Sequence, residues 1–353
     1  MVPRRRPTAL KRMAAALACS AFVGACATAR KTPTPAPTPP AALCADASLE
    51  VDDFCMPAEW LDDLLRAEQF EVVAVEVAPS GFSRPKKLHL RIPGDRGGES
   101  VVIAIKWKPA PRGGEGFNNH PRKELAAYEF QQLFLDPDEY VIPPTTVFCI
   151  PVTRHRAEIS DEPPTFPGTR CVLGLAAYWL QNVTSEGARD LERFERDPAF
   201  RASLAKLNLL THLIDQRDSR TANFLRSTDP DRPRLFSIDN GLAFGGFKNP
   251  FTLMGFIADW AEIHVPALPR RSVERLRALT RSDLDRLAVV AQFERRDGML
   301  VRVAAGAPRF RDRGVRVEGS TIQLGLTRRE IDRIHERLRL LLERVDRGGI
   351  ELF

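Results

Sequence analysis

The sequence lacks several features that would assign it to a common class of protein. Histidine is scarce, with six among 353 residues, and the six cysteines form no Cys-x-x-Cys pair, so there is no zinc-binding signature. After residue 25, no apolar run approaches the roughly 18 residues expected of a membrane-spanning helix. Five of the six net positive charges lie in residues 1–25. The nearly neutral remainder does not favour nucleic acid as a partner.

The first 45 residues are typical of an exported protein with a lipid anchor. Basic residues between Arg4 and Arg12 precede an apolar run, 13–25, that is too short to cross a bilayer as a helix. The run ends in Val-Gly-Ala-Cys26, which resembles a bacterial lipobox and predicts lipidation of Cys26. Cys19, which follows Ala-Leu-Ala, is the weaker alternative.

Residues 1–25 are therefore predicted to be a lipoprotein signal peptide. Residues 26–45 are rich in proline, which favours an extended chain, and we interpret them as a linker between the anchor and a folded body. The expected location is the bacterial cell envelope, at the outer membrane or on the periplasmic side, with membrane contact made through the lipid.

Four cysteines follow the predicted anchor, and an even number in an exported chain favours disulfide bonds. Of the three pairings that four cysteines allow, proximity in the sequence favours Cys44–Cys55 and Cys149–Cys171. Four buried free thiols are the alternative.

The folded body is predicted to be α+β, with a strand-rich first half and a helical second half. Alternating or continuous apolar residues predict strands over 71–78, 87–92, 99–106, 171–180, 222–226 and 234–238. Apolar residues three and four apart predict helices after Pro57 and over 121–135, 198–215, about 271–296 and from Thr327 onward. Residues 297–325 show no clear period and receive no assignment.

Two acidic motifs near the middle of the chain suggest phosphoryl transfer. Asp218 is followed five residues later by Asn223, the spacing of an aspartate base and a metal-binding asparagine in catalytic loops of kinases. Asp239 ends the next predicted strand and is followed by Asn-Gly, which is typical of a turn but also projects a carboxylate into a cleft. Such a carboxylate is a hard oxygen ligand for Mg²⁺.

A lysine and a glutamate in the first half complete the pattern. Lys106 closes an apolar strand and requires a partner, which Glu124 on the next helix or a nucleotide phosphate would provide. Lys108 shares the face of Lys106 and is expected to be the exposed lysine of the two. Glu129, on a different face of the helix, is the alternative to Glu124.

These four signals occur in the order strand lysine, helix glutamate, Asp-x4-Asn and strand-end aspartate. In this order the chain resembles atypical kinases of the phosphatidylinositol 3-/4-kinase-like group. The segment Asp239-Asn-Gly-Leu-Ala-Phe resembles the metal-binding segment of type II phosphatidylinositol 4-kinases. The same Asp-Asn-Gly with Phe244-Gly245 is similar to secretory-pathway kinases related to Golgi casein kinase. Glu124-Leu-Ala-Ala-Tyr, followed by Val-Ile-Pro-Pro-Thr145, is similar to that group and to HipA-type kinases.

The resemblance covers about residues 70–345 and implies a role for each motif. It implies a two-lobed kinase-like fold, with a strand-rich lobe over 46–175 that has one main helix. The second lobe, 176–353, would be mostly helical and carry a catalytic hairpin. Asp218 would be the catalytic base and Lys106 the phosphate lysine, with Glu124 as its partner. Asp239 and Asn223 would bind the metal.

The resemblance also implies ATP as the nucleotide and Mg²⁺, or alternatively Mn²⁺, as the metal. Tyr178 and Leu180 would lie at the adenine. Ser80, Gly81 and Ser83 would form the phosphate loop, which has one glycine where the family has several. The implied activity is phosphotransfer to a hydroxyl of a protein, sugar or lipid, and nucleotidyl transfer is a variant. The alternative is an inactive kinase-like envelope lipoprotein that binds a nucleotide or a partner.

Overall fold

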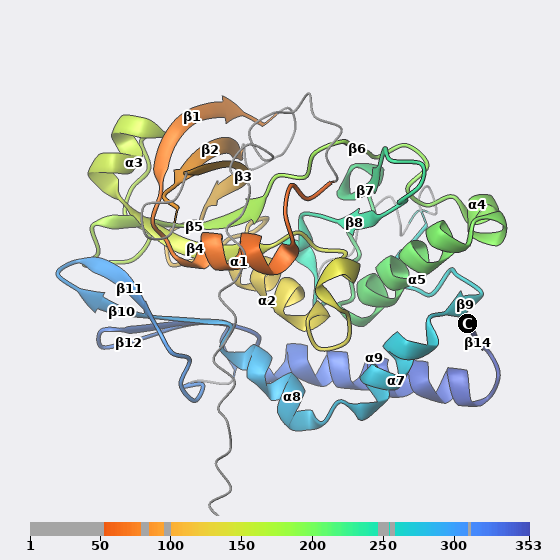
Figure 1. Ribbon diagram of the computed structural model, residues 1–353. Helices are drawn as coiled ribbons and strands as arrows, with labels where there is room; N and C mark the ends of the chain where they lie inside the picture. Colours follow the sequence, from red (N-terminus) through yellow and green to blue (C-terminus); the bar gives the residue numbers. More distant parts are fainter. Residues whose placement is uncertain (1–52, 79–84, 95–99, 246–253, 255–257, 310–311) are drawn as a thin grey trace, which may run out of the picture. The chain divides into compact units, whose positions relative to one another are not determined.

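A five-stranded antiparallel sheet with the strand order β1-β2-β3-β5-β4 forms the first half of the folded body (Figure 1). The computed structural model describes residues 53–353 except 79–84, 95–99, 246–253, 255–257 and 310–311, and the described residues belong to one compact unit. The strands are β1 (Glu71–Val77), β2 (Lys86–Ile92), β3 (Val101–Pro109), β4 (Thr145–Pro151) and β5 (Cys171–Tyr178). The expected signal peptide, linker, Cys26, Cys44 and the phosphate-loop residues Ser80, Gly81 and Ser83 lie outside the described residues.

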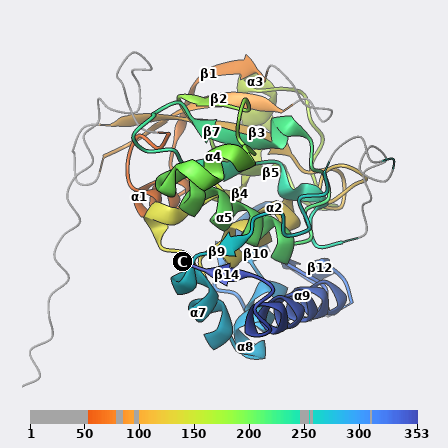
Figure 2. The ribbon, with the colours of Figure 1, turned by 90° about the vertical axis from the view of Figure 1, so that its right-hand side faces the viewer.

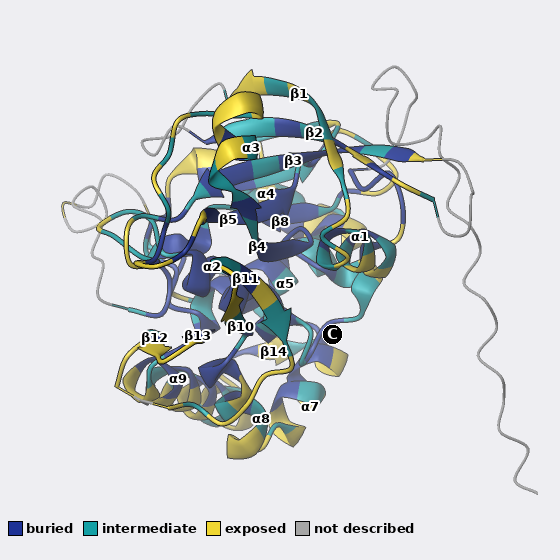
Figure 3. Ribbon diagram, turned by 90° about the vertical axis from the view of Figure 1, so that its left-hand side faces the viewer, coloured by how far each residue is buried: buried dark blue, intermediate teal, exposed yellow. Residues whose placement is uncertain are grey.

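Position in the sheet explains the sequence pattern of each strand. The edge strand β1 is mostly exposed or half-buried, whereas every residue of β5 is buried (Figure 3). Because β5 lies between β3 and β4 and is covered on both faces, its sequence is a continuous apolar run rather than an alternating one. The sequence-based strands over 71–78, 87–92, 99–106 and 171–180 are confirmed, while β4 was not predicted.

Helices pack against this sheet and continue into the second half. Helix α2 (Pro121–Gln131) begins with proline in its first turn, where an N–H donor is not needed, and it contacts β4 and β5. The remaining helices are α1 (Ala58–Arg66), α3 (Val152–Glu158), α4 (Leu191–Arg196), α5 (Pro198–Leu213), α7 (Arg270–Ala278), α8 (Arg281–Asp285) and α9 (Arg328–Asp346). Among the described residues, none of these helices has both the length and the apolar character needed to cross a membrane.

The second half contains the predicted helix and hairpin. Asp197 caps α5 by accepting hydrogen bonds from the N–H groups of Ala199 and Phe200, and the helix ends at Leu213. Strands β6 (Val183–Thr184), β7 (Phe224–Ser227) and β8 (Leu235–Ser237) form a three-stranded antiparallel sheet beside it. Helices α7 and α9 pack against each other, and β9 (Ala267–Leu268) pairs with β14 (Glu351–Leu352) (Figure 2).

A four-stranded antiparallel sheet, formed by the residues between α8 and α9 in the sequence, corrects the expectation of a mostly helical second half. Its order is β11-β10-β13-β12, with β10 (Ala291–Arg296), β11 (Met299–Val303), β12 (Val315–Glu318) and β13 (Thr321–Leu324). The predicted helix over 271–296 is therefore wrong at its end. Ala291 and Phe293 are buried in alternation, and with Ile322 and Leu324 they form a core with Val147 and Leu173 of β4 and β5. Six residues of alternation are too few to be distinguished from part of a helix.

The disulfide bond Cys149–Cys171 is present, as predicted, and joins β4 to the first residue of β5. Cys55 is also disulfide-bonded. Its expected partner, Cys44, lies outside the described residues, so that pairing stays a prediction.

Candidate functional site

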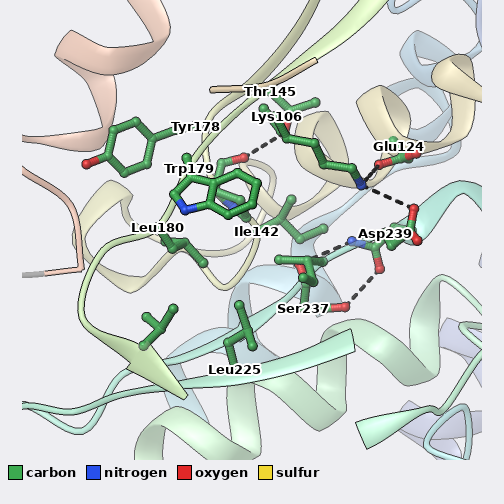
Figure 4. A pocket seen from close by; sticks show the side chains of 15 residues that line it. Lys106, Glu124, Ile142, Thr145, Tyr178, Trp179, Leu180, Leu225, Ser237 and Asp239 are labelled. Atoms are coloured by element: carbon green, nitrogen blue, oxygen red, sulfur yellow. Dashed lines mark hydrogen bonds and ion pairs between the residues drawn. The ribbon is translucent and has the colours of Figure 1, made fainter. Parts of the chain in front are cut away.

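A pocket with apolar walls and one charged end lies between the five-stranded sheet and the segments that follow β5 and β8 (Figure 4). Its empty space is about 630 Å³ when the open mouth is included. The walls are apolar because they come from buried strands and the segment after β5. The lining residues are Lys106, Glu124, Ile142, Pro143, Thr145, Ala177, Tyr178, Trp179, Leu180, Val183, Leu225, Ser237, Ile238, Asp239 and Asn240.

The charged end brings together three of the residues that the sequence singled out. Lys106 extends from β3 across the pocket, and its Nζ lies 3.5 Å from Glu124 Oε2 and 3.2 Å from Asp239 Oδ1 (Figure 4). Glu124 lies in the first turn of α2, and Asp239 follows β8. The alternative partner, Glu129, instead forms an ion pair with Arg66 at 2.6 Å. Three separate elements therefore converge on one ion-paired cluster.

Lys108 belongs to the same cluster, which corrects the expectation that it is the exposed lysine. Its Nζ lies 3.1 Å from both Glu124 Oε1 and Asp239 Oδ1, and only 2% of its side chain is exposed, compared with 17% for Lys106. Burial alone would lower the pKa of Lys108, but the two carboxylates outweigh burial and raise that pKa above its ordinary value. The alternation of the strand placed both lysines on one face. It could not indicate which of the two is covered by neighbouring elements.

Asp239 is held in an uncommon backbone conformation. Its φ of 59° lies in the left-handed region, which aspartate tolerates better than most residues. Burial alone would raise the pKa of Asp239, but Lys106 and Lys108 outweigh burial and hold that pKa below its ordinary value. The carboxylate therefore stays ionised and faces the two ammonium groups.

A buried amide network supports the segment around Asp239, and sequence reasoning missed it. Gln216 Nε2 donates to Asn240 Oδ1 at 3.0 Å, and Ser237 Oγ donates to the same oxygen at 2.8 Å. Gln216 Oε1 also accepts a hydrogen bond from the backbone N–H of Asp218 at 3.3 Å. One glutamine thus links the Asp218 loop to the segment that carries Asp239.

Gly241 lets helix α2 approach this segment closely. A Cβ atom at position 241 would lie 3.2 Å from Glu124 Oε1 and 3.6 Å from its Cγ, so any larger residue would press on the glutamate. The Asp-Asn-Gly sequence is therefore more than a turn signal, because the glycine makes room for the carboxylate that pairs with both lysines.

The predicted base, Asp218, is buried and already has partners. Arg220 Nε and Nη2 each lie 3.0 Å from the Asp218 carboxylate, and Asn223 Nδ2 donates to Asp218 Oδ2 at 3.0 Å and to its backbone oxygen at 2.8 Å. Arg220 also lies 4.0 Å from Asp239 Oδ2 and so spans the two aspartates. Asp218 and Asn223 are thus paired with each other.

Asp215 has the structural surroundings expected of an aspartate at a helix end. Its Oδ1 lies 2.9 Å from Arg217 Nε and 3.4 Å from Arg337 Nη1 of helix α9. Asp215 and Asp218 are therefore held by different arginines.

Tyr178 and Leu180 both line the pocket, but the two side chains are placed differently. The Tyr178 hydroxyl accepts a hydrogen bond from the backbone N–H of Cys55 at 3.2 Å, and its ring packs edge-on against Phe54, so its polar end is used within the protein. Burial raises the pKa of Tyr178 to about 12. Trp179 and Leu180 form the wall opposite the charged cluster (Figure 4).

Helix α2 carries two more buried charges that connect the site to α9. Arg122 donates to Glu330 Oε2 at 2.8 Å and to Glu330 Oε1 at 3.2 Å. Lys123 donates to the backbone oxygen of Ala243 at 2.8 Å and lies 3.5 Å from Glu330 Oε1. Glu330 was visible in the sequence as part of a capping box, but nothing in that motif indicated a partner 208 residues away.

The donor set fits a divalent cation that arrives with a phosphate. Asp239 and Asn223 offer hard oxygen atoms, but Asp239 Oδ1 already accepts from both lysines and the Asn223 amide nitrogen is bonded to Asp218. Within the described ranges, no group of three or more His, Cys, Asp or Glu residues could hold a metal. Mg²⁺ is commonly bound through one or two carboxylates together with nucleotide phosphates and water, which fits these residues.

No protein-family model matches this chain, and no curated protein sequence matches it.

Proposed function

We propose that this protein is a Mg²⁺- and ATP-dependent phosphotransferase of the atypical kinase type. The observation that supports the proposal is the pocket itself, whose apolar walls end in the cluster of Lys106, Glu124 and Asp239 beside the Asp218 loop. The flat faces of an adenine ring are apolar and a triphosphate is an anion, so this distribution of surfaces matches the base and the phosphates of ATP.

The fold that belongs to this proposal has two kinase-like lobes, near 46–175 and 176–353. The order of elements supports it: the lysine strand β3, the glutamate helix α2, the strand β5 leading to Leu180, helix α5, the Asp218 loop, the hairpin β7–β8 and then Asp239. The four-stranded sheet β10–β13 would be an addition to this plan.

Each residue would then have a defined task. The base would lie against Leu180 and neighbouring apolar side chains, and Lys106 would hold the phosphates. Bound Mg²⁺ would neutralise phosphate charge, with Asp239 and Asn223 as its ligands from the protein. Asp218 would accept the proton of the acceptor hydroxyl while the acceptor oxygen bonds to the γ-phosphorus and ADP leaves. The acceptor would be a hydroxyl of a protein, sugar or lipid.

The test is incubation of the purified full-length protein with Mg²⁺ or Mn²⁺ and ATP labelled at either the γ- or the α-phosphate. Label from the γ-position on the protein or on an added acceptor supports phosphotransfer, whereas label from the α-position indicates nucleotidyl transfer. Asp218→Asn is expected to reduce transfer by about 10²-fold or more and to retain nucleotide binding. Asp239→Asn is expected to weaken nucleotide binding itself.

Asp215→Asn is the matched control, because it removes a neighbouring aspartate that is held by Arg217 and Arg337 instead. Its effect is expected on stability more than on rate. A variant series in which Asp215 is essential and Asp218 is silent contradicts the proposed catalytic loop.

One observation favours a second candidate function, a kinase-like protein that binds nucleotide without transferring phosphate. The Asp218 carboxylate is paired with both Arg220 and Asn223, and these hydrogen bonds compete with an acceptor hydroxyl for the same oxygen atoms. Saturable binding of Mg²⁺-ATP together with no transfer from either labelled position selects this candidate.

We also propose that the protein is exported and held at the cell envelope by lipid on Cys26, as the basic, apolar and lipobox segments of the sequence favour. Cys26→Ser is expected to release the protein from membranes or block its processing. Unchanged membrane association, with labelled fatty acid still incorporated, rejects the assignment to Cys26.

A further inference from the structure

The two lysines of strand β3 have different surroundings although both reach the same two carboxylates. Lys108 contacts three separate segments through one nitrogen: Glu124 Oε1 on α2 at 3.1 Å, Asp239 Oδ1 after β8 at 3.1 Å, and the backbone oxygen of Asn118 at 3.5 Å. Asn118 lies in the turn that leads into α2. Lys108 therefore joins the strand, the start of the helix and the aspartate segment.

Lys106 makes longer contacts, at 3.5 Å to Glu124 Oε2 and 3.2 Å to Asp239 Oδ1, and it keeps more of its side chain exposed. It also lines the pocket, which Lys108 does not. An incoming anion can therefore reach the ammonium group of Lys106 directly, while that of Lys108 is covered.

The residue between them explains why Lys108 is held in place. Trp107 points to the opposite face of β3, where its ring stacks on Phe148 with 5.0 Å between centroids. Its indole N–H donates to His155 Nε2 at 3.0 Å. Because this face of the strand is packed and hydrogen-bonded, β3 is not free to rotate, and the ammonium group of Lys108 stays between the two carboxylates.

We propose that the two lysines have separate roles: Lys108 is a positioning residue that clamps Glu124 and Asp239 together, and Lys106 alone meets the phosphate. The role of Lys106 rests on the proposed function, whereas the clamp does not. With Lys108 present, two carboxylates face two ammonium groups, so the charges of these four side chains are balanced before any metal or nucleotide arrives. The site is thus arranged in advance rather than assembled by its ligands.

Melting temperature tests the clamp with a matched pair of variants on one strand. Lys108→Met leaves the buried Glu124 and the partly exposed Asp239 facing one ammonium group, and it is expected to lower the melting temperature by about 6 °C or more. Lys106→Met removes a more exposed ammonium group and is expected to lower it by less than half as much. An equal or larger loss for Lys106→Met overturns the assignment.

A second variant distinguishes a charge clamp from simple packing and also covers the case in which Lys108→Met folds poorly. Glu124→Gln removes one of the two negative charges, so adding it to Lys108→Met restores the balance of one carboxylate with one ammonium group. The double variant is expected to melt at or above the temperature of Lys108→Met, although Glu124→Gln alone lowers it. Losses that simply add show that Lys108 acts through its packed stem and reject the clamp.

Calorimetric binding of ATP and adenosine, both with Mg²⁺, tests the role of Lys106. Lys106→Met is expected to weaken the binding of ATP about tenfold and to leave the binding of adenosine unchanged. Lys108→Met is expected to keep the ratio of the two affinities within about threefold of the ratio for the unmodified protein. The reverse pattern overturns the division of roles. If the unmodified protein binds neither compound, the proposed function fails, while the melting data still decide whether Lys108 is the clamp.

Discussion

The link between helices α2 and α9 offers a sharp test of what holds the site in place. The Glu330 carboxylate receives two hydrogen bonds from Arg122 and lies 3.5 Å from Lys123 Nζ. It also accepts from the backbone N–H and the hydroxyl of Thr327, at 2.8 and 3.0 Å, and so completes the N-terminal cap of α9. Glu330→Gln removes the charge with little change in shape.

The size of the expected effect follows from burial. Glu330 and Arg122 are both buried, and breaking a buried ion pair costs about 3–5 kcal/mol because a charge is left without its partner. Arg122 retains Glu115 at 2.6 Å and the backbone oxygen of Gly325 at 3.2 Å, which points to the lower end of that range. A loss of about 3 kcal/mol corresponds to a fall of roughly 6 °C in melting temperature for a domain of this size.

The assay is thermal unfolding of Glu330→Gln beside Asp332→Asn. Asp332 lies two residues further along α9 and forms an ion pair with Arg281 at 2.6 Å. Both side chains are well exposed, and an exposed ion pair contributes about 1 kcal/mol or less to the free energy of unfolding. Because Arg122 and Lys123 directly precede Glu124 in helix α2, Glu330→Gln is also expected to weaken nucleotide binding if the proposed function holds. Equal melting temperatures for the two variants would refute the reasoning.

Two further predictions follow from burial elsewhere in the protein. Burial holds the pKa of His212 at about 4, below its ordinary value of 6.5, so the unfolded chain binds a proton more readily than the folded one. The contribution of neutral His212 to the free energy of unfolding is therefore expected to be complete above about pH 6.5 and to fall by up to about 3 kcal/mol as pH drops to about 4. Denaturant unfolding across this pH range should show a smaller change in the free energy of unfolding for His212→Gln. An unchanged pH dependence in that variant would exclude His212 as the source. Gly174→Ala would place a Cβ 2.4 Å from the Trp107 ring. The variant is therefore expected to lower the free energy of unfolding by about 2 kcal/mol, measured with denaturant, and to shift the strand that carries both lysines. A variant as stable as the unmodified protein would contradict this packing.

Much of the secondary structure could be predicted from the sequence because the signals are local. The apolar spacing in α5, its Asp-Pro start and the capping box of α9 each lie within a few residues, and both helices are confirmed. Strands β1, β2, β3 and β5 were visible for the same reason. The sheet β10–β13 was missed because its strands have only four to six residues, so their alternation is brief, and arginine and glutamate make up half of β10 and of β12.

The sequence by itself determined which residues carry charge and on which face of a local element each of them lies. It placed Lys106 and Lys108 on one face of a strand, Glu124 in the first turn of a helix and Asp239 after a hairpin. Only the tertiary structure decided that Lys108 is the covered lysine, that Asn223 pairs with Asp218, and that Arg122 meets Glu330. The lysines and Asp239 are more than 130 residues apart, and Arg122 and Glu330 are 208 apart. Such contacts depend on how elements pack over these separations, and side-chain periodicity carries no information about that packing.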